Sequence, residues 1–139
     1  MIAREQAPLA RVLLADDDPQ VLRSLASSLT RAGFTVTTAD DGAPAIALAE
    51  AATFDIVIAD LNMRTSGTSV VHHYKRRYGA GVYCAVLSGD DDDTTRQACL
   101  EAGADDVFVK PAPAAALRRR LTEAALALRA AADAHERSA

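Results

Sequence analysis

Short apolar runs alternate with longer stretches of helical periodicity along this chain, and the alternation constrains the fold more than any other feature. The runs are rich in branched residues, which is typical of buried parallel strands joined by helical crossovers. We expect five strands, at 11–16, 34–39, 55–60, 82–88 and 107–110. We expect five helices, at 19–32, 42–52, 68–78, 93–102 and from 113 to 128.

This order of elements leaves few topologies, because strand–helix–strand crossovers are right-handed almost without exception. We predict an α/β fold with a doubly wound, five-stranded parallel sheet in the order 2-1-3-4-5 and helices on both faces, as in flavodoxin. In that order the first and third strands are neighbours. Ligands bind such sheets at the carboxyl ends of the strands.

Composition narrows the class of protein. The 139 residues are 50% hydrophobic and 24% charged, which fits one globular domain. The net charge of −4 argues against direct binding of nucleic acid, whose phosphates favour a positive partner. We see neither an apolar segment long enough to span a bilayer nor a secretory signal, so we expect a cytoplasmic protein with no membrane partner.

Polar side chains follow four of the five apolar runs. They are Asp16 and Asp17 after the first, Asp60 at the end of the third, Ser88 at the end of the fourth and Lys110 after the fifth. Clustered carboxylates repel one another unless a cation offsets their charge, and Mg²⁺ prefers carboxylate, water and phosphate oxygens. Lysine and serine can both donate to phosphoryl oxygens. The sequence therefore predicts a site for Mg²⁺ and a phosphoryl group.

The segments around these residues resemble the receiver domain of two-component response regulators. The resemblance covers about 12–126 and rests on Leu14–Pro19, Ile58–Met63, Val86–Gly89 and the Gly103–Pro111 segment. It implies a CheY-like fold, Mg²⁺ as the cofactor and a signalling domain that catalyses only its own phosphorylation and dephosphorylation. The implied phosphoryl donor is a sensor histidine kinase or a histidine phosphotransfer protein.

The resemblance also implies a role for each site residue. Asp60 matches the phosphoacceptor, Ser88 the switch hydroxyl and Lys110 the lysine that contacts the phosphoryl group. The implied metal ligands are Asp16, Asp17, Asp60 and the backbone carbonyl of Asn62. The implied partners further include a downstream output module or a second copy of the chain. We divide the chain into an N-terminal extension at 1–10, a receiver domain at 11–128, and a tail that frays or begins a connector at 129–139.

Three features depart from the family pattern. Val107 stands where an aromatic residue usually precedes the lysine, and Phe108 should face the opposite side of the strand. The loop after Asp60 is shorter than usual, and Arg64 in this loop should lie near the opening of the phosphorylation site. Four acids, Asp90–Asp93, follow the switch serine, and one or two of them should cap the next helix.

Two other functions stay open at this point. One is a pseudo-receiver that binds partners without phosphorylation, an alternative that Val107 supports because the usual aromatic residue is missing. The other is a haloacid-dehalogenase-type phosphatase, whose signature after the first strand requires a threonine at the position of Gln20. The intact acids disfavour the first of these alternatives, and the missing threonine disfavours the second.

Overall fold

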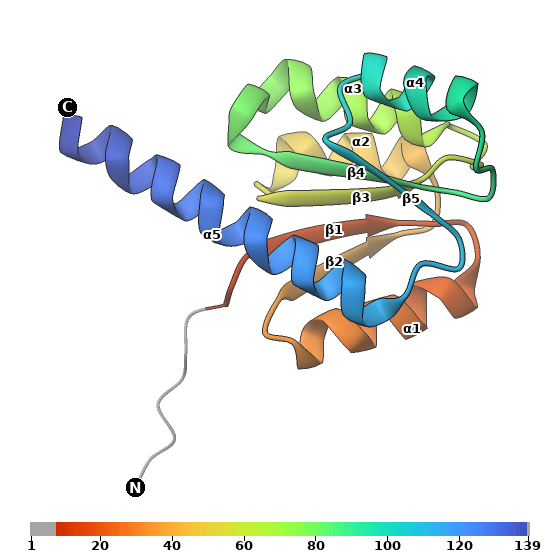
Figure 1. The fold of residues 1–139 in the computed structure, drawn as a ribbon, viewed down its shortest axis with the longest axis horizontal. Helices are drawn as coiled ribbons and strands as arrows, with labels where there is room; N and C mark the ends of the chain where they lie inside the picture. Colours follow the sequence, from red (N-terminus) through yellow and green to blue (C-terminus); the bar gives the residue numbers. More distant parts are fainter. Residues whose placement is uncertain (1–7, 139) are drawn as a thin grey trace, which may run out of the picture.

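A computed structural model describes residues 8–138 and contains one parallel sheet in the order β2-β1-β3-β4-β5 (Figure 1). The strands are β1 Arg11–Ala15, β2 Thr35–Ala39, β3 Ile56–Asp60, β4 Tyr83–Ser88 and β5 Asp106–Val109. The helices are α1 Pro19–Arg31, α2 Gly42–Ala51, α3 Gly67–Tyr78, α4 Asp93–Glu101 and α5 Ala114–Ser138, with a 3₁₀ turn at Gly79–Gly81. The expected strand order and fold class are confirmed.

Helices cover both faces of the sheet, with α1 and α5 on one side and α2, α3 and α4 on the other (Figure 1). The central strands β1, β3 and β4 are buried almost throughout, because alternate side chains enter opposite hydrophobic clusters. In β1, Leu13 packs beneath α2 and α3, whereas Val12 and Leu14 pack beneath α1 and α5. The apolar runs rich in branched residues are therefore the central strands, and their side chains form a hydrophobic core on each face of the sheet.

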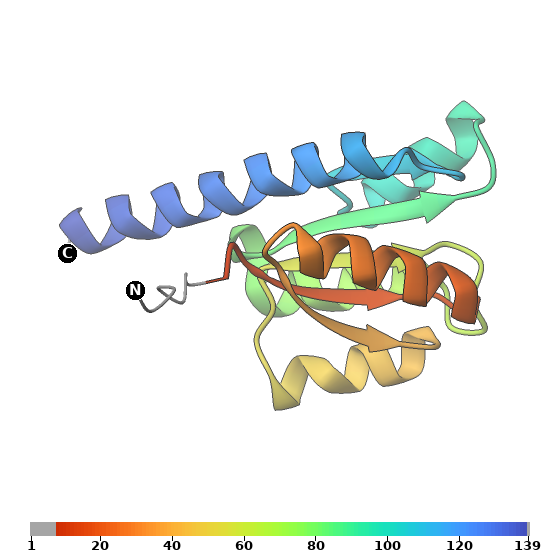
Figure 2. The same ribbon diagram turned by 90° about the horizontal axis from the view of Figure 1, so that it is seen from below.

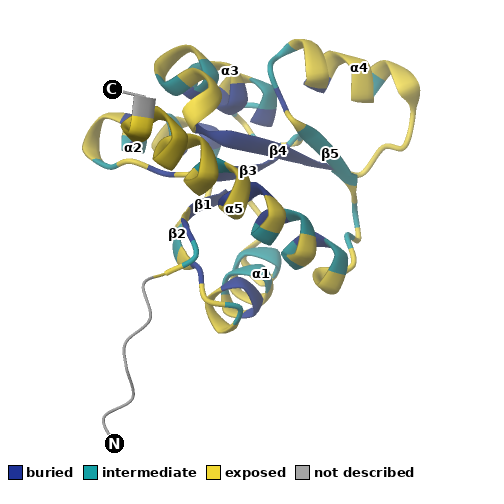
Figure 3. Cartoon of the chain, turned by 60° about the vertical axis from the view of Figure 1, so that its left-hand side comes forward, coloured by how far each residue is buried: buried dark blue, intermediate teal, exposed yellow. Residues whose placement is uncertain are grey.

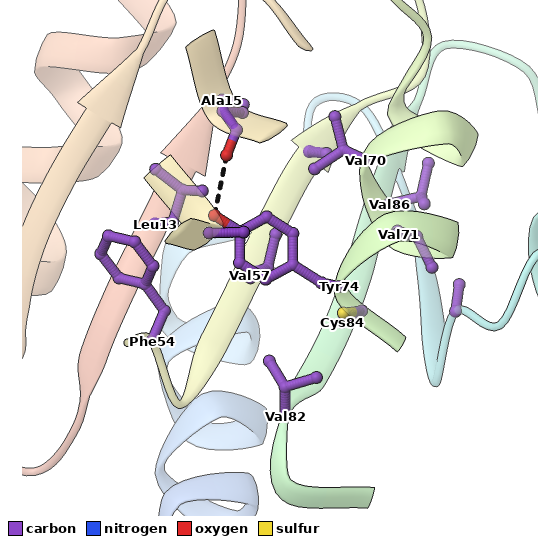
Figure 4. Packing of buried hydrophobic residues seen from close by; sticks show 14 of the residues in the cluster. Leu13, Ala15, Phe54, Val57, Val70, Val71, Tyr74, Val82, Cys84 and Val86 are labelled. Carbon is purple, nitrogen blue, oxygen red and sulfur yellow. Dashed lines mark hydrogen bonds between the residues drawn. The ribbon is translucent and has the colours of Figure 1, made fainter. Parts of the chain in front are cut away.

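Tyr74 of α3 is the largest fully buried side chain and ties α3 to α2 (Figure 4). Its ring lies among Val57, Val70 and Val82, and its hydroxyl donates a hydrogen bond to the carbonyl oxygen of Ala45 at 2.7 Å. That bond satisfies a polar group which would otherwise be costly to bury. The second face of the sheet thus carries α2 and α3 as a joined pair.

The helix ends follow local signals in the sequence. Asp18 caps α1 by accepting a hydrogen bond from the backbone N–H of Gln20, and Pro19 occupies the first turn. Gly33 follows the helix with a φ of 105°, in the left-handed region where a side chain would be strained. These signals end α1 close to where the sequence predicts.

Helix α5 is longer than expected. It continues past residue 128 to Ser138 and projects beyond the body of the domain, at the end opposite the strand arrowheads (Figure 2). Residues 129–137 are all exposed (Figure 3), and their alanine-rich composition favours a helix there. The guanidinium of Arg129 donates to the carbonyl oxygens of Pro8 and Leu9, at 3.3 and 3.1 Å. The segment expected to be a tail that frays or begins a connector is thus helical as far as Ser138.

Within residues 8–138, no helix has the length and apolar character needed to cross a membrane.

Candidate functional site

Three carboxylates meet at the carboxyl ends of β1 and β3. The two strands are hydrogen-bonded neighbours, with Ala15 opposite Ala59, so the residues that follow them share one edge of the sheet. Asp16, Asp17 and Asp60 each offer a carboxylate oxygen, and these oxygens lie within 4.8 Å of one another. The expected acidic cluster is present.

The three carboxylates of the cluster differ in their exposure to solvent. Asp16 is fully buried and Asp60 is 4% exposed, whereas Asp17 is exposed to solvent. Asp16 also accepts a hydrogen bond from the backbone N–H of Asp18 at 2.9 Å, which fixes one of its oxygens. An ion or phosphoryl group would therefore approach from the side of Asp17.

Lys110 reaches the cluster from the end of β5. Its Nζ lies 2.9 Å from Asp16 Oδ2 and 3.2 Å from Asp60 Oδ1. The backbone N–H of Lys110 donates to the carbonyl oxygen of Ser88 at 2.7 Å, and the following bond to Pro111 is cis. Four strand ends thus bring three acids, one ammonium and one hydroxyl to the same edge.

The charges of the site shift the pKa values of Asp60 and Lys110. Burial raises the pKa of the Asp60 carboxyl, and the neighbouring charge of Asp16 raises it further, against the opposing effect of Lys110. Burial lowers the pKa of Lys110, but its hydrogen bond to Asp16 and the two carboxylate charges outweigh this, so its pKa is raised. A buried excess of negative charge remains that a cation would relieve.

The loop after β3 folds back on the phosphoacceptor candidate. The backbone N–H of Asn62 lies 3.4 Å from Asp60 Oδ1, and Asn62 itself is exposed. Gly67 opens α3 directly above the strand end, where a Cβ would lie 2.4 Å from the carbonyl oxygen of Asp60. Only glycine fits there, because the loop is drawn so tightly over the strand.

Ser88 is buried at the end of β4, but its hydroxyl is engaged within its own loop. Its Oγ accepts a hydrogen bond from the backbone N–H of Asp90 at 3.0 Å and lies 3.1 Å from the carbonyl oxygen of the same residue. The structure therefore brings Ser88 to the correct edge with its hydroxyl paired to Asp90 rather than to Asp60. Sequence reasoning did not foresee this pairing.

The departures from the family pattern fall on distinct surfaces. Val107 packs against the cluster beneath α2 and α3, and Phe108 packs on the opposite face of the sheet, as expected. Asp92 caps α4 by accepting from the backbone N–H of Thr95 at 2.7 Å, which accounts for one of the four consecutive acids. Arg64 is exposed on the β3–α3 loop. The pKa of Asp41 is lowered chiefly by a hydrogen bond from the backbone N–H of Thr65, with a smaller effect of the Arg64 charge.

The donor set fits a hard divalent cation. Magnesium takes oxygen ligands, keeps several waters and uses few carboxylates, which suits three carboxylate oxygens around one open side. The neighbouring ammonium suits a phosphoryl oxygen. Fold and site together define a class of protein: a doubly wound α/β domain whose strand ends carry an acidic cluster and a lysine, a set of groups that suits Mg²⁺ and a phosphoryl oxygen.

Comparisons with known proteins give the family. The model for "Response regulator receiver domain" matches residues 12–122. The chain is 45% identical over 102 residues to the transcriptional regulatory protein PrrA of Mycobacterium tuberculosis, covering 73% of this chain and 43% of that protein. It is 41% identical over 101 residues to the transcriptional regulatory protein KdpE of the same species, covering 72% and 44%.

A solved structure agrees with these matches. The chemotaxis response regulator CheY4 of Vibrio cholerae superposes with a TM-score of 0.76 at 29% identity, covering 83% of this chain and 98% of that one. The chain belongs to the receiver domain family of two-component response regulators. It spans less than half the length of the two curated relatives described above.

Proposed function

We propose that Asp60 accepts a phosphoryl group from a phosphohistidine, on a sensor histidine kinase or a histidine phosphotransfer protein, with Mg²⁺ as cofactor. The observation that carries this proposal is the ammonium of Lys110, held between Asp16 and Asp60 beside an exposed Asp17. The proposed metal ligands are Asp16, Asp17, Asp60 and the backbone carbonyl of Asn62. The acids that the family pattern requires are all present, which counts against a pseudo-receiver.

The chemistry needs positioning and charge neutralisation more than covalent assistance. A carboxylate oxygen of Asp60 attacks phosphorus, the P–N bond to the donor histidine breaks, and the imidazole leaves with the bonding electrons. Phosphoryl transfer of this kind passes through a loose transition state, with charge spread over the equatorial oxygens. Lys110 neutralises part of that charge, and a bound Mg²⁺ would neutralise more.

Phosphorylation would then act through Ser88 and the loop that follows it. The acyl phosphate carries roughly two negative charges at the end of β3, in place of the single charge of the Asp60 carboxylate. Ser88 can donate to it only by giving up its bond with Asp90, so the loop between β4 and α4 must move. We place the output in partner contacts on α4 and β5, with a downstream module or a second copy of the chain as the partner. We also propose that the protein is cytoplasmic, that its receiver domain spans residues 11–128, and that residues 129–139 form a tail or the start of a connector.

Intact mass spectrometry tests the assignment of Asp60. The protein is incubated with acetyl phosphate and Mg²⁺, and one added phosphoryl group is expected. The adduct should be absent without Mg²⁺ and absent in Asp60→Asn. The matched control is Asp91→Asn, because Asp91 is an exposed acid of the β4–α4 loop and its loss changes the net charge equally. An adduct that persists in Asp60→Asn would refute the assignment, and no adduct in the wild type would favour the pseudo-receiver.

A further inference from the structure

The loop between β3 and α3, residues 61–66, is attached to the preceding β2–α2 loop. Asp41 Oδ1 accepts a hydrogen bond from the backbone N–H of Thr65 at 3.0 Å, and the two residues are 24 positions apart. This bond is the largest cause of the lowered pKa of Asp41, and the charge of Arg64 adds to it. A carboxylate paired with a backbone N–H forms one of the stronger hydrogen bonds in proteins.

A second contact between the two loops also involves Thr65. Gly42 is buried directly after Asp41, and a Cβ at this position would lie 2.2 Å from the carbonyl oxygen of Thr65. The two loops therefore meet backbone to backbone, with the N–H of Thr65 bonded on one side and its carbonyl in contact on the other. We call these contacts, made by Asp41 and Gly42 on Thr65, the Thr65 clasp.

Hydrogen bonds between the two ends of the β3–α3 loop also close it on itself. Ser66 Oγ and the backbone N–H of Gly67 both donate to the carbonyl oxygen of Leu61, at 3.2 and 3.3 Å. Between this closure and the Thr65 clasp lie Asn62 and Arg64, which are both exposed, and the backbone N–H of Asn62 lies 3.4 Å from Asp60 Oδ1. The position of the Asn62 backbone therefore depends on how the two ends of the loop are held.

From this geometry we propose that Asp41 is a positioning residue for the magnesium site. By fixing Thr65, Asp41 holds the backbone of Asn62 where its carbonyl can serve as a metal ligand. This inference rests on the proposed function, because it presumes the metal site described above. Groups that orient metal ligands without touching the metal typically change its affinity about 10- to 100-fold when they are removed.

The test compares three variants by isothermal titration calorimetry with MgCl₂. Asp41→Ala should weaken Mg²⁺ binding about tenfold. Asp41→Asn keeps a side-chain oxygen that can accept from Thr65, and should recover most of that loss. Asp40→Ala is the matched control: Asp40 is exposed and adjacent, so its removal changes the charge near the site almost equally without touching Thr65.

Amide hydrogen exchange at Thr65, measured by NMR without Mg²⁺, supplies a readout independent of the metal. Exchange should accelerate in Asp41→Ala and stay unchanged in Asp40→Ala, with thermal unfolding confirming that both variants are folded. If the wild type binds Mg²⁺ and Asp41→Ala binds it as tightly as Asp40→Ala does, the positioning role is overturned while the proposed function stands. If the wild type binds no Mg²⁺, both are overturned.

Discussion

Lys110 Nζ lies 2.9 Å from Asp16 Oδ2, joining residues 94 positions apart in the chain. Asp16 is fully buried, whereas the Lys110 side chain is 28% exposed. A buried carboxylate without a partner would carry a large desolvation penalty. The ammonium therefore stabilises the folded domain as well as serving the proposed phosphoryl transfer.

Replacing Lys110 should lower both stability and phosphorylation. We expect Lys110→Ala to reduce the free energy of unfolding by about 2 kcal/mol, because Asp16 then stays buried without its ion-pair partner. This is less than the loss of a fully buried pair costs, since Lys110 is partly exposed and Asp16 keeps its hydrogen bond from Asp18. Urea denaturation measures the change, with Arg77→Ala as control. Arg77 pairs with Glu50 on the surface, where both side chains are more than half exposed, so its loss should cost under about 1 kcal/mol. Equal losses in the two variants would contradict this account.

Stability should depend on pH through Asp60. Its pKa is raised in the folded protein, chiefly by burial, above the ordinary aspartate value of 3.8 that applies in the unfolded chain. The native state therefore holds this proton more tightly, and the resulting stability is present below pH 3.8 and lost as pH rises through the folded pKa. Urea titrations without Mg²⁺ should show the wild type losing stability relative to Asp60→Asn as pH rises across that window. If the wild type instead gained stability relative to Asp60→Asn as pH rises, the raised pKa of Asp60 would be contradicted.

Gly67→Ala should destabilise the protein, because the added Cβ would lie 2.4 Å from the backbone oxygen of Asp60. We expect a loss of about 1–3 kcal/mol, the usual cost of overpacking, together with slower phosphorylation of the displaced Asp60. Gly89→Ala is the control, since a Cβ there meets no atom within 4 Å. Urea denaturation and intact mass after a fixed time with acetyl phosphate measure both effects. Similar behaviour of the two variants would show that the loop adapts.

Arg129→Ala should loosen the projecting part of α5. The guanidinium bonds to two backbone carbonyls near the start of β1, and these bonds anchor the exposed turns. Amide exchange in residues 130–138 should accelerate, while global stability changes by less than about 1 kcal/mol because the site is on the surface. Arg119→Ala on an exposed part of the same helix serves as control. Unchanged exchange in Arg129→Ala would mean that composition alone maintains the helix.

Several features could be predicted from the sequence because they depend on local pattern. Branched apolar runs specified the strands, and alternation along β5 put Val107 and Phe108 on opposite faces. The acids at 16, 17 and 60 converge because parallel strands end at one edge, which the order of elements already implies. A helix cap at Asp18 is likewise a short-range signal.

Other features were decided only by the tertiary structure. Periodicity places Ser88 at a strand end, but the path of its loop determines that the hydroxyl pairs with Asp90. The bond between Asp41 and Thr65 depends on two loops meeting in space. The hydrogen bonds between Arg129 of α5 and carbonyls near the start of β1 likewise join segments far apart in the chain. The sequence determined which residues lie at this edge of the sheet, because strands that alternate with helices are parallel and end at the same edge. The partner of each polar group depended on three-dimensional packing, because hydrogen bonds form only where distant backbone segments come within about 3 Å.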